Sequence, residues 1–132
     1  MNPEILALCR YASEHNGQLT IVDTFDAIIA PKLPWREYFY VAAKINLADC
    51  NADYKNIAMG IIHIGEITKP IFEATSPFVH SENMEKLNMV AGLKGLIFEH
   101  TGDYILRISL DETIVAELPF KVMLKENGHD KQ

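Results

Sequence analysis

The residues that could carry acid–base or metal chemistry are few and lie far apart in this sequence of 132 residues. Its five histidines are His15, His63, His80, His100 and His129. None of them stands with another histidine, a cysteine or a carboxylate at a spacing typical of zinc ligands. His63 lies inside an apolar run, where an imidazole more often packs or forms a hydrogen bond than binds a metal. The sequence therefore predicts no metal site.

One short string, His80-Ser81-Glu82, contains a base, a hydroxyl and a carboxylate. Neighbours on a loop point in different directions, so the string does not predict a catalytic triad. The sequence also has no Gly-x-Ser-x-Gly elbow and no glycine-rich phosphate loop. We therefore predict no catalytic residue and no cofactor. If the chain is instead a small enzyme or a ligand carrier, His80, Glu82 and His100 would supply the acid or base at one end of the fold.

Six aspartates fall near the ends of predicted strands, where loops of a β-sandwich can gather carboxylates around calcium. They are Asp23, Asp26, Asp49, Asp53, Asp103 and Asp111. No segment matches an EF-hand loop, and turn aspartates usually accept hydrogen bonds from their own backbone. The pattern favours turns over a calcium site.

The composition disfavours several classes of partner. A net charge of −6 and a pI near 5.3 argue against nucleic acids and anionic membranes, which attract clustered Lys and Arg. The longest apolar runs fall far short of the roughly 20 residues of a membrane span. The first residues lack the basic and apolar regions of a signal peptide. These features predict a cytoplasmic protein that binds neither nucleic acid nor membrane.

The two cysteines, Cys9 and Cys50, are predicted to be reduced thiols, as expected for a reducing compartment. Cys9 stands among apolar residues and is predicted to be a small buried side chain. Cys50 lies in a polar stretch and is predicted to be an exposed loop thiol.

Alternation of apolar and polar residues predicts most of the secondary structure as β-strand. The alternating or β-branched segments are Gln18–Ile29, Trp35–Leu47, Ile57–Ile64, Ile71–Ala74, Tyr104–Leu110 and Thr113–Leu124. Asp111-Glu112 supplies a turn between the last two, which predicts a hairpin. In the final strand, Ile114 and Phe120 share the parity that should face the core.

In two further segments periodicity alone favours a helix, although a strand also fits. Asn2 could cap a helix that starts at Pro3 and stops at Asn16-Gly17, or Glu4–Tyr11 could be a strand that pairs through that turn with the next segment. Ser81–Gly92 likewise has apolar residues at helical spacing, whereas Leu87–Leu93 alternates as a strand would.

Several strings resemble those of a bacterial family of small uncharacterised proteins. They are Ala7-Leu8-Cys9-Arg10-Tyr11-Ala12, Phe39-Tyr40-Val41-Ala42-Ala43-Lys44, Gly102-Asp103-Tyr104 and Glu117-Leu118-Pro119. The resemblance implies an immunoglobulin-like antiparallel β-sandwich, all-β, with both ambiguous segments as strands and a total of seven or eight. The resemblance implies no activity, ligand or partner. Independently of this resemblance, the absence of an internal repeat or a linker predicts one domain over residues 1–125, and the polar last residues predict a tail over residues 126–132.

Within such a sandwich, Gly102 and Tyr104 have a structural interpretation. A tyrosine that follows a tight turn at the start of a late strand can direct its hydroxyl to a backbone carbonyl and close a corner of the fold.

The outward parity of Trp35–Leu47 carries Tyr38 and Tyr40 where a solvent-facing strand usually carries charge. Aromatic residues are enriched at protein interfaces, so these two tyrosines predict a homodimer that packs across a two-fold axis. Alternatively, the segment Ala74–Met84 covers this surface within one molecule. The predicted function is a noncatalytic module that binds itself or another, unknown protein.

Overall fold

The structure, a computed structural model, describes residues 3–47, 54–65, 68–79 and 84–126. These residues form nine strands and no helix. The strands are β1 (Pro3–His15), β2 (Gln18–Phe25), β3 (Ala27–Ala30), β4 (Trp35–Asn46), β5 (Asn56–Ile64), β6 (Lys69–Pro77), β7 (Lys86–Phe98), β8 (Gly102–Leu110) and β9 (Thr113–Leu124).

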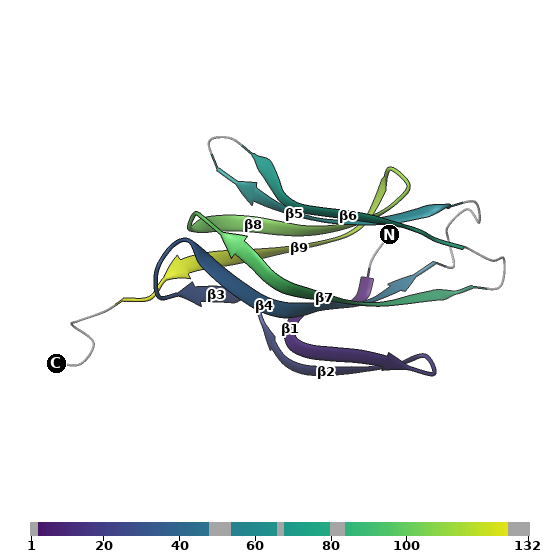
Figure 1. Cartoon of the computed structure of the whole chain (residues 1–132). Coiled ribbons are helices and arrows are strands. Elements are labelled where there is room, and N and C mark those ends of the chain that lie inside the picture. The colour runs from purple at the N-terminus through teal and green to yellow at the C-terminus, as the bar shows by residue number, and fades with distance from the viewer. Residues whose placement is uncertain (1–2, 48–53, 66–67, 80–83, 127–132) are drawn as a thin grey trace.

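The strands pack as two sheets (Figure 1). One sheet has four strands in the order β2-β1-β4-β7, and the other has five in the order β3-β9-β8-β5-β6. All neighbouring strands are antiparallel except β3 and β9, which are parallel. The pair β4-β7 occupies the B and E positions of an immunoglobulin sandwich, and β5, β8 and β9 occupy the C, F and G positions of the facing sheet. The predicted all-β, immunoglobulin-like sandwich is therefore confirmed.

The strand count exceeds the predicted seven or eight because Gln18–Ile29 is not one strand. The chain bends at Asp26, so β2 ends at Phe25 in one sheet and β3 begins at Ala27 in the other. The backbone carbonyl of Asp26 accepts a hydrogen bond from the Lys121 amide of β9, which fixes the chain against its new neighbour. The run of β-branched residues carries no sign of this change of sheet, since both halves favour strand.

Both ambiguous segments are strands, as the family resemblance implied. β1 pairs with β2 on one side and β4 on the other, and β7 pairs with β4 along its whole length. Burial of neighbouring residues on both faces explains why periodicity favoured a helix in β1, where Leu8 and Cys9 are each fully buried.

The core lies between the two sheets and is built from alternate residues of each central strand. In β4 the inward residues are Phe39, Val41, Ala43 and Ile45. Burial of each of the larger side chains, those of Phe39, Val41 and Ile45, contributes roughly 1.5–3 kcal/mol to the free energy of folding. Among the described residues the buried set contains no charged side chain and no polar one beyond the Tyr104 hydroxyl.

The expected inward position of Ile114 is wrong. Ser109 of β8 pairs with Ile114 and Ile108 pairs with Ala116, so Val115 is an extra residue in β9. This β-bulge reverses the parity of the strand, leaving Ile114 half-exposed while Val115 is buried.

The left-handed backbone conformation at Gly95 in β7 can be tested by substitution. It is an extra residue between Lys94, paired with Tyr38, and Leu96, paired with Glu37, and its φ is +88°. An L-residue is strained there, so Gly95→Ala should lower the free energy of unfolding by about 1 kcal/mol or more, measured by urea denaturation.

Gly60→Ala is the matched control, because a Cβ at Gly60 would make only an ordinary contact, 3.6 Å from the Phe72 carbonyl oxygen. Removing a glycine from a strand interior should leave stability unchanged or raise it by about 0.5 kcal/mol. Equal losses in the two variants would contradict the assignment of strain to Gly95.

Candidate functional site

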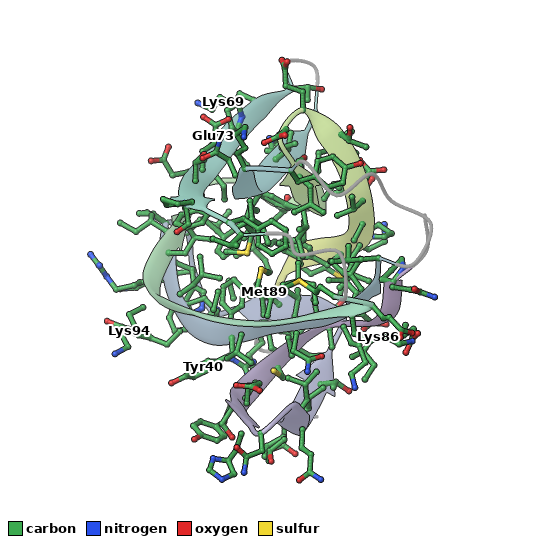
Figure 2. All side chains as sticks on the ribbon, turned by 90° about the vertical axis from the view of Figure 1, so that its right-hand side faces the viewer. Tyr40, Lys69, Glu73, Lys86, Met89 and Lys94 are labelled. Carbon is green, nitrogen blue, oxygen red and sulfur yellow. The ribbon has the colours of Figure 1, made fainter. Side chains whose placement is uncertain are left out.

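The outer face of the four-stranded sheet carries the residues that β4 and β7 point away from the core. On β4 these residues are Tyr38, Tyr40, Ala42 and Lys44. Their register partners on β7 are Lys94, Gly92, Val90 and Asn88. Figure 2 shows Tyr40 below the ribbon and Met89, which packs on the core, above it. The parity predicted for Tyr38 and Tyr40 places them on this face.

The β1–β2 hairpin lies against part of this face, below β4 and β7 in Figure 1. Its tip is the two-residue turn Asn16-Gly17, in which both residues have positive φ. The Gly17 carbonyl accepts a hydrogen bond of 3.0 Å from the Asn88 side-chain amide of β7. The hairpin therefore reaches across β4 to the edge strand of the sheet.

A second, smaller apolar cluster fills the space beneath the hairpin. Its members are Cys9, Ala12 and Ala42, which are buried, and Ile21, Tyr40 and Val90, which are partly buried. The described part of Ala74–Met84 does not supply the cover considered from the sequence, because Ala74–Pro77 belongs to β6 of the other sheet. Residues 80–83 of that segment lie outside the described residues.

Three tyrosines remain accessible beside this cluster, and we call Tyr11, Tyr38 and Tyr40 the tyrosine face. Tyr38 is 59% exposed and Tyr11 is 48% exposed, whereas Tyr40 is half-buried. The rings of Tyr11 and Tyr40 meet edge to face with centroids 5.3 Å apart. Tyr40 also lies over Gly92, where a Cβ would come within 3.1 Å of its ring. The glycine thus makes room for the ring, and contacts on two sides hold it in place.

Cations surround the tyrosine face. Arg36 precedes Tyr38 on the same parity, and its guanidinium donates a hydrogen bond of 3.5 Å to the Gly95 carbonyl. Lys44 and Lys94 stand on the same outer rows of β4 and β7. Within the described residues, none of these three cations has a carboxylate within 4.0 Å. Arg36 and Lys94 therefore place positive charge beside Tyr38, although the chain carries a net charge of −6. Lys44 lies beyond Ala42, which the hairpin buries.

The outer face of the five-stranded sheet has a different charge arrangement. Arg107 pairs with Glu117 at 2.7 Å, and Lys121 pairs with Asp103 at 2.7 Å. These two cations of the five-stranded sheet are therefore neutralised by carboxylates of the same sheet.

The second candidate site is a corner of the fold around Tyr104. The Tyr104 hydroxyl donates a hydrogen bond of 2.6 Å to the His100 carbonyl, and its ring packs between Phe98 and Phe120. Burial raises the pKa of this hydroxyl, so it stays protonated near neutral pH and acts as a donor rather than as a base. Gly102 begins β8 with a φ of +121°, a conformation that L side chains rarely adopt.

Two histidines complete this corner. His63 and His100 stack with ring centroids 5.4 Å apart, and the His63 Nε2 atom lies 3.2 Å from the Thr101 carbonyl oxygen. A cleft of about 380 Å³ between β6 and β7 opens beside His100. The polar atoms of Tyr104 and His63 are thus directed to backbone carbonyls rather than to the cleft.

Of the acid–base residues considered from the sequence, His100 is the one that the structure describes at this corner. His80 and Glu82 lie outside the described residues. Phe78, just before them in the chain, has its amide bonded to the Lys55 carbonyl at the start of β5, whereas His100 stacks on His63 near the end of β5. The length of β5 therefore separates His100 from Phe78.

Two of the aspartates near strand ends, Asp103 and Asp111, bind neighbouring protein groups through their carboxylates. The Asp111 carboxylate accepts hydrogen bonds from the amides of Lys55 and Asn56 at 3.1 and 3.0 Å, and Asp103 pairs with Lys121. Asp49 and Asp53 lie outside the described residues. Among the residues that the structure describes, no three His, Cys, Asp or Glu side chains cluster as metal ligands would.

Removal of the Tyr104 hydroxyl tests how much its hydrogen bond to the His100 carbonyl contributes to stability. Tyr104→Phe should lower the free energy of unfolding by about 1 kcal/mol, because the His100 carbonyl loses its partner while the ring packing remains. Tyr38→Phe is the control, since its hydroxyl makes no described hydrogen bond and its loss should leave the unfolding midpoint unchanged. Identical midpoints in all three proteins would show that the corner bond contributes nothing.

The Cys9 thiol offers a test of the cluster beneath the hairpin. Burial raises its pKa, and its Sγ atom points to the Tyr40 carbonyl oxygen at 3.7 Å. In a Cys50→Ser variant, a disulfide reagent at mildly alkaline pH should therefore label Cys9 only after denaturation, because the native thiol is inaccessible and less ionised than a free one. Rapid labelling of the folded protein would mean that the hairpin opens readily.

Comparison with known proteins identifies a family whose function is unknown. A model of a family of unknown function, DUF6941, matches residues 4–123. A comparison with curated proteins finds no match. Among solved structures, an immunoglobulin-like protein from Pseudomonas aeruginosa is similar, with 12% identity over 87% of this chain and 90% of that one and a TM-score of 0.43. The described residues contain no helix long and apolar enough to cross a membrane. The family match spans all nine strands almost completely, and the chain belongs to DUF6941.

Proposed function

We propose that this chain is a noncatalytic module that binds another protein through the tyrosine face. One observation carries the proposal. Tyr38 and Tyr11 are exposed, and the ring of Tyr40 beside them is already fixed by packing. Tyrosine offers a large apolar surface and a polar hydroxyl at little cost in side-chain entropy, which is why it is frequent at protein interfaces.

The packing of the face supports this role. Arg36 and Tyr40 each lie over a glycine of β7, and Tyr40 also meets Tyr11 edge to face. Side chains held in this way lose little freedom on binding, so more of the contact energy appears as affinity. Such preorganisation on rigid strands is typical of binding surfaces.

The corner around Tyr104 supports a structural role for the other candidate residues. The Tyr104 hydroxyl and the His63 Nε2 atom each lie against a backbone carbonyl. Burial raises the pKa of the Tyr104 hydroxyl, which disfavours a role for it as a base. Acid–base catalysis needs a group placed to exchange a proton with substrate. The Tyr104 hydroxyl, which donates to the His100 carbonyl, is not placed in that way.

The homodimer predicted from Tyr38 and Tyr40 is one form that such binding could take, with a second copy of the chain as the partner. The cytoplasmic location predicted from the sequence is part of the same proposal. Figure 2 shows that Tyr40 points away from the sandwich, on the side that any partner would approach.

Site-specific photo-crosslinking in the cells that produce the protein tests the proposal. A photoreactive phenylalanine at position 38 should form a discrete covalent adduct with another polypeptide, because this side chain is 59% exposed at the centre of the face. The matched control places the same residue at Ile29, which is 51% exposed on β3 of the other sheet.

An adduct from position 38 that position 29 does not give, detected by electrophoresis and identified by mass spectrometry, supports the tyrosine face as the binding surface. No adduct from position 38, or the same adducts from both positions, would contradict the proposal. Circular dichroism of each purified variant establishes that the substituted proteins are folded.

A further inference from the structure

We propose that Asn16, at the tip of the β1–β2 hairpin, is a site of spontaneous deamidation, and that its conversion to isoaspartate releases the hairpin from the sheet. Glycine has no side chain to shield its backbone nitrogen, so an asparagine that precedes glycine is open to attack on its side-chain amide. Asn16-Gly17 is such a pair, and both residues are exposed. A Cβ at Gly17 would meet nothing within 4 Å, so the turn has open space around it.

The reaction has two steps and consumes only water. In the first step the Gly17 nitrogen attacks the side-chain carbonyl carbon of Asn16, an N–C bond forms, and the Gly17 amide gives up its proton. The bond from that carbon to Nδ2 breaks, and Nδ2 takes up a proton and leaves as ammonia, which closes a succinimide ring. In the second step water opens the ring on either side and gives aspartate or isoaspartate.

The Glu14 carboxylate is placed to take the first proton. Its Oε2 atom accepts a hydrogen bond of 2.7 Å from the Gly17 amide, the group that must lose a proton as it attacks. General base catalysis requires a base within hydrogen-bond reach of the proton that it removes. We therefore assign Glu14 as the proton acceptor of the first step.

The His15 imidazole is placed at the leaving group. Its Nε2 atom lies 3.2 Å from Asn16 Nδ2, the nitrogen that leaves as ammonia. A protonated imidazole at this position can donate a proton to Nδ2 as the bond to carbon breaks. The register of the hairpin holds both groups beside the turn, since His15 pairs with Gln18 and Glu14 pairs with Leu19.

The Gly17 nitrogen reaches the side-chain carbon only when the backbone rotates about Asn16, so the turn must open briefly. Exposed turns open at a much lower cost in free energy than the core of a fold. In the described structure β1 pairs with β4 from Pro3 to Cys9 and beyond Cys9 with β2 alone. The tip can therefore open without breaking any pairing with β4 (Figure 1).

Isoaspartate at position 16 would change the shape of the tip, because the chain then passes through the side chain and gains a methylene group. A two-residue turn with positive φ at both positions fixes the register of its strands and does not accommodate an extra backbone atom. The Gly17 carbonyl, which accepts the 3.0 Å hydrogen bond from the Asn88 side-chain amide, would be displaced.

The loss of that hydrogen bond weakens the attachment of the hairpin. The Asn88 Oδ1 atom is already buried without a partner among the described residues, so its side chain would keep no described hydrogen bond. A buried polar group without a partner is unfavourable, and the tip is expected to move away from β7. The cover over Cys9 and Ala42 then loosens.

The first test follows deamidation of the full chain during incubation at physiological temperature. Mass spectrometry of proteolytic fragments should show a gain of about 1 Da in the fragment that contains Asn16. An isoaspartyl methyltransferase should methylate the same fragment. Asn127-Gly128 of the same chain is the internal reference for the rate of this dipeptide.

Variants test the two assigned groups. Glu14→Gln should slow conversion of Asn16 at least about threefold, because glutamine can still accept the Gly17 hydrogen bond but is not a base. His15→Gln should slow it as well, through loss of the proton donor. Glu73→Gln removes one carboxylate at an exposed position of β6 and should convert as the wild type does. Absence of conversion at Asn16, or a rate that Glu14→Gln leaves unchanged or raises, would overturn the proposal.

The second test measures release of the hairpin in a Cys50→Ser background. The isoaspartate form, separated by ion-exchange chromatography, should be labelled at Cys9 by a disulfide reagent at least about tenfold faster than the unmodified folded protein. Asn16→Asp is the matched control, because it adds the same charge without the extra methylene group. Aspartate followed by glycine also forms this turn, so the variant should be labelled slowly.

Equal labelling of the isoaspartate and unmodified forms would overturn the release of the hairpin. Rapid labelling of Asn16→Asp would overturn its assignment to the longer backbone. Circular dichroism of each form establishes that the compared proteins are folded.

Discussion

The central strand β4 must bury apolar side chains on both of its faces, and the four-stranded sheet depends on this requirement. Neighbouring residues Ala42 and Ala43 point to opposite sides, and both are fully buried. One side is covered by the facing sheet, as in any sandwich. The other side needs a cover of its own, which the β1–β2 hairpin supplies by reaching across to Asn88. The hairpin stops short of Tyr38, and the exposed surface begins where that cover ends.

The edge strand β7 adds a second constraint to the same surface. An edge strand presents unpaired backbone groups, and lysines or a bulge commonly protect such an edge from pairing with other chains. β7 has Lys86 and Lys94 toward its two ends and the bulge at Gly95. Lys94 therefore serves to protect this edge as well as placing a cation opposite Tyr38. Arg36 and Lys44 lie on the inner strand β4, where edge protection does not account for them.

The sequence predicted the strands well because period-two alternation follows directly from a half-buried sheet. It predicted the outward parity of Tyr38 and Tyr40 for the same reason, and the geometry of Tyr104 from its place after a turn. The bulge at Val115 and the change of sheet at Asp26 were missed, because both depend on pairing with distant strands rather than on local composition. The hairpin cover was missed likewise, since Gly17 and Asn88 meet only in the folded chain.

The positive charge beside Tyr38 is the feature that sequence reasoning had least means to find. Arg36 could have been placed beside Tyr38 and Tyr40 from their shared parity, but Lys94 joins them only through the register of β7 on β4. Averaged over the chain, the charge is −6 and suggests no affinity for anions.

An exposed cation without a carboxylate partner is hydrated and costs the fold little, so its isolation alone does not indicate a ligand. The arrangement becomes informative because Arg36 and the Tyr40 ring are each held over a glycine, beside a Tyr38 ring that the fold leaves exposed. Side chains fixed in this way beside an uncovered aromatic surface lose little conformational entropy when another protein binds. The packing that holds Arg36 and Tyr40 on the sheet therefore also favours binding at its outer face.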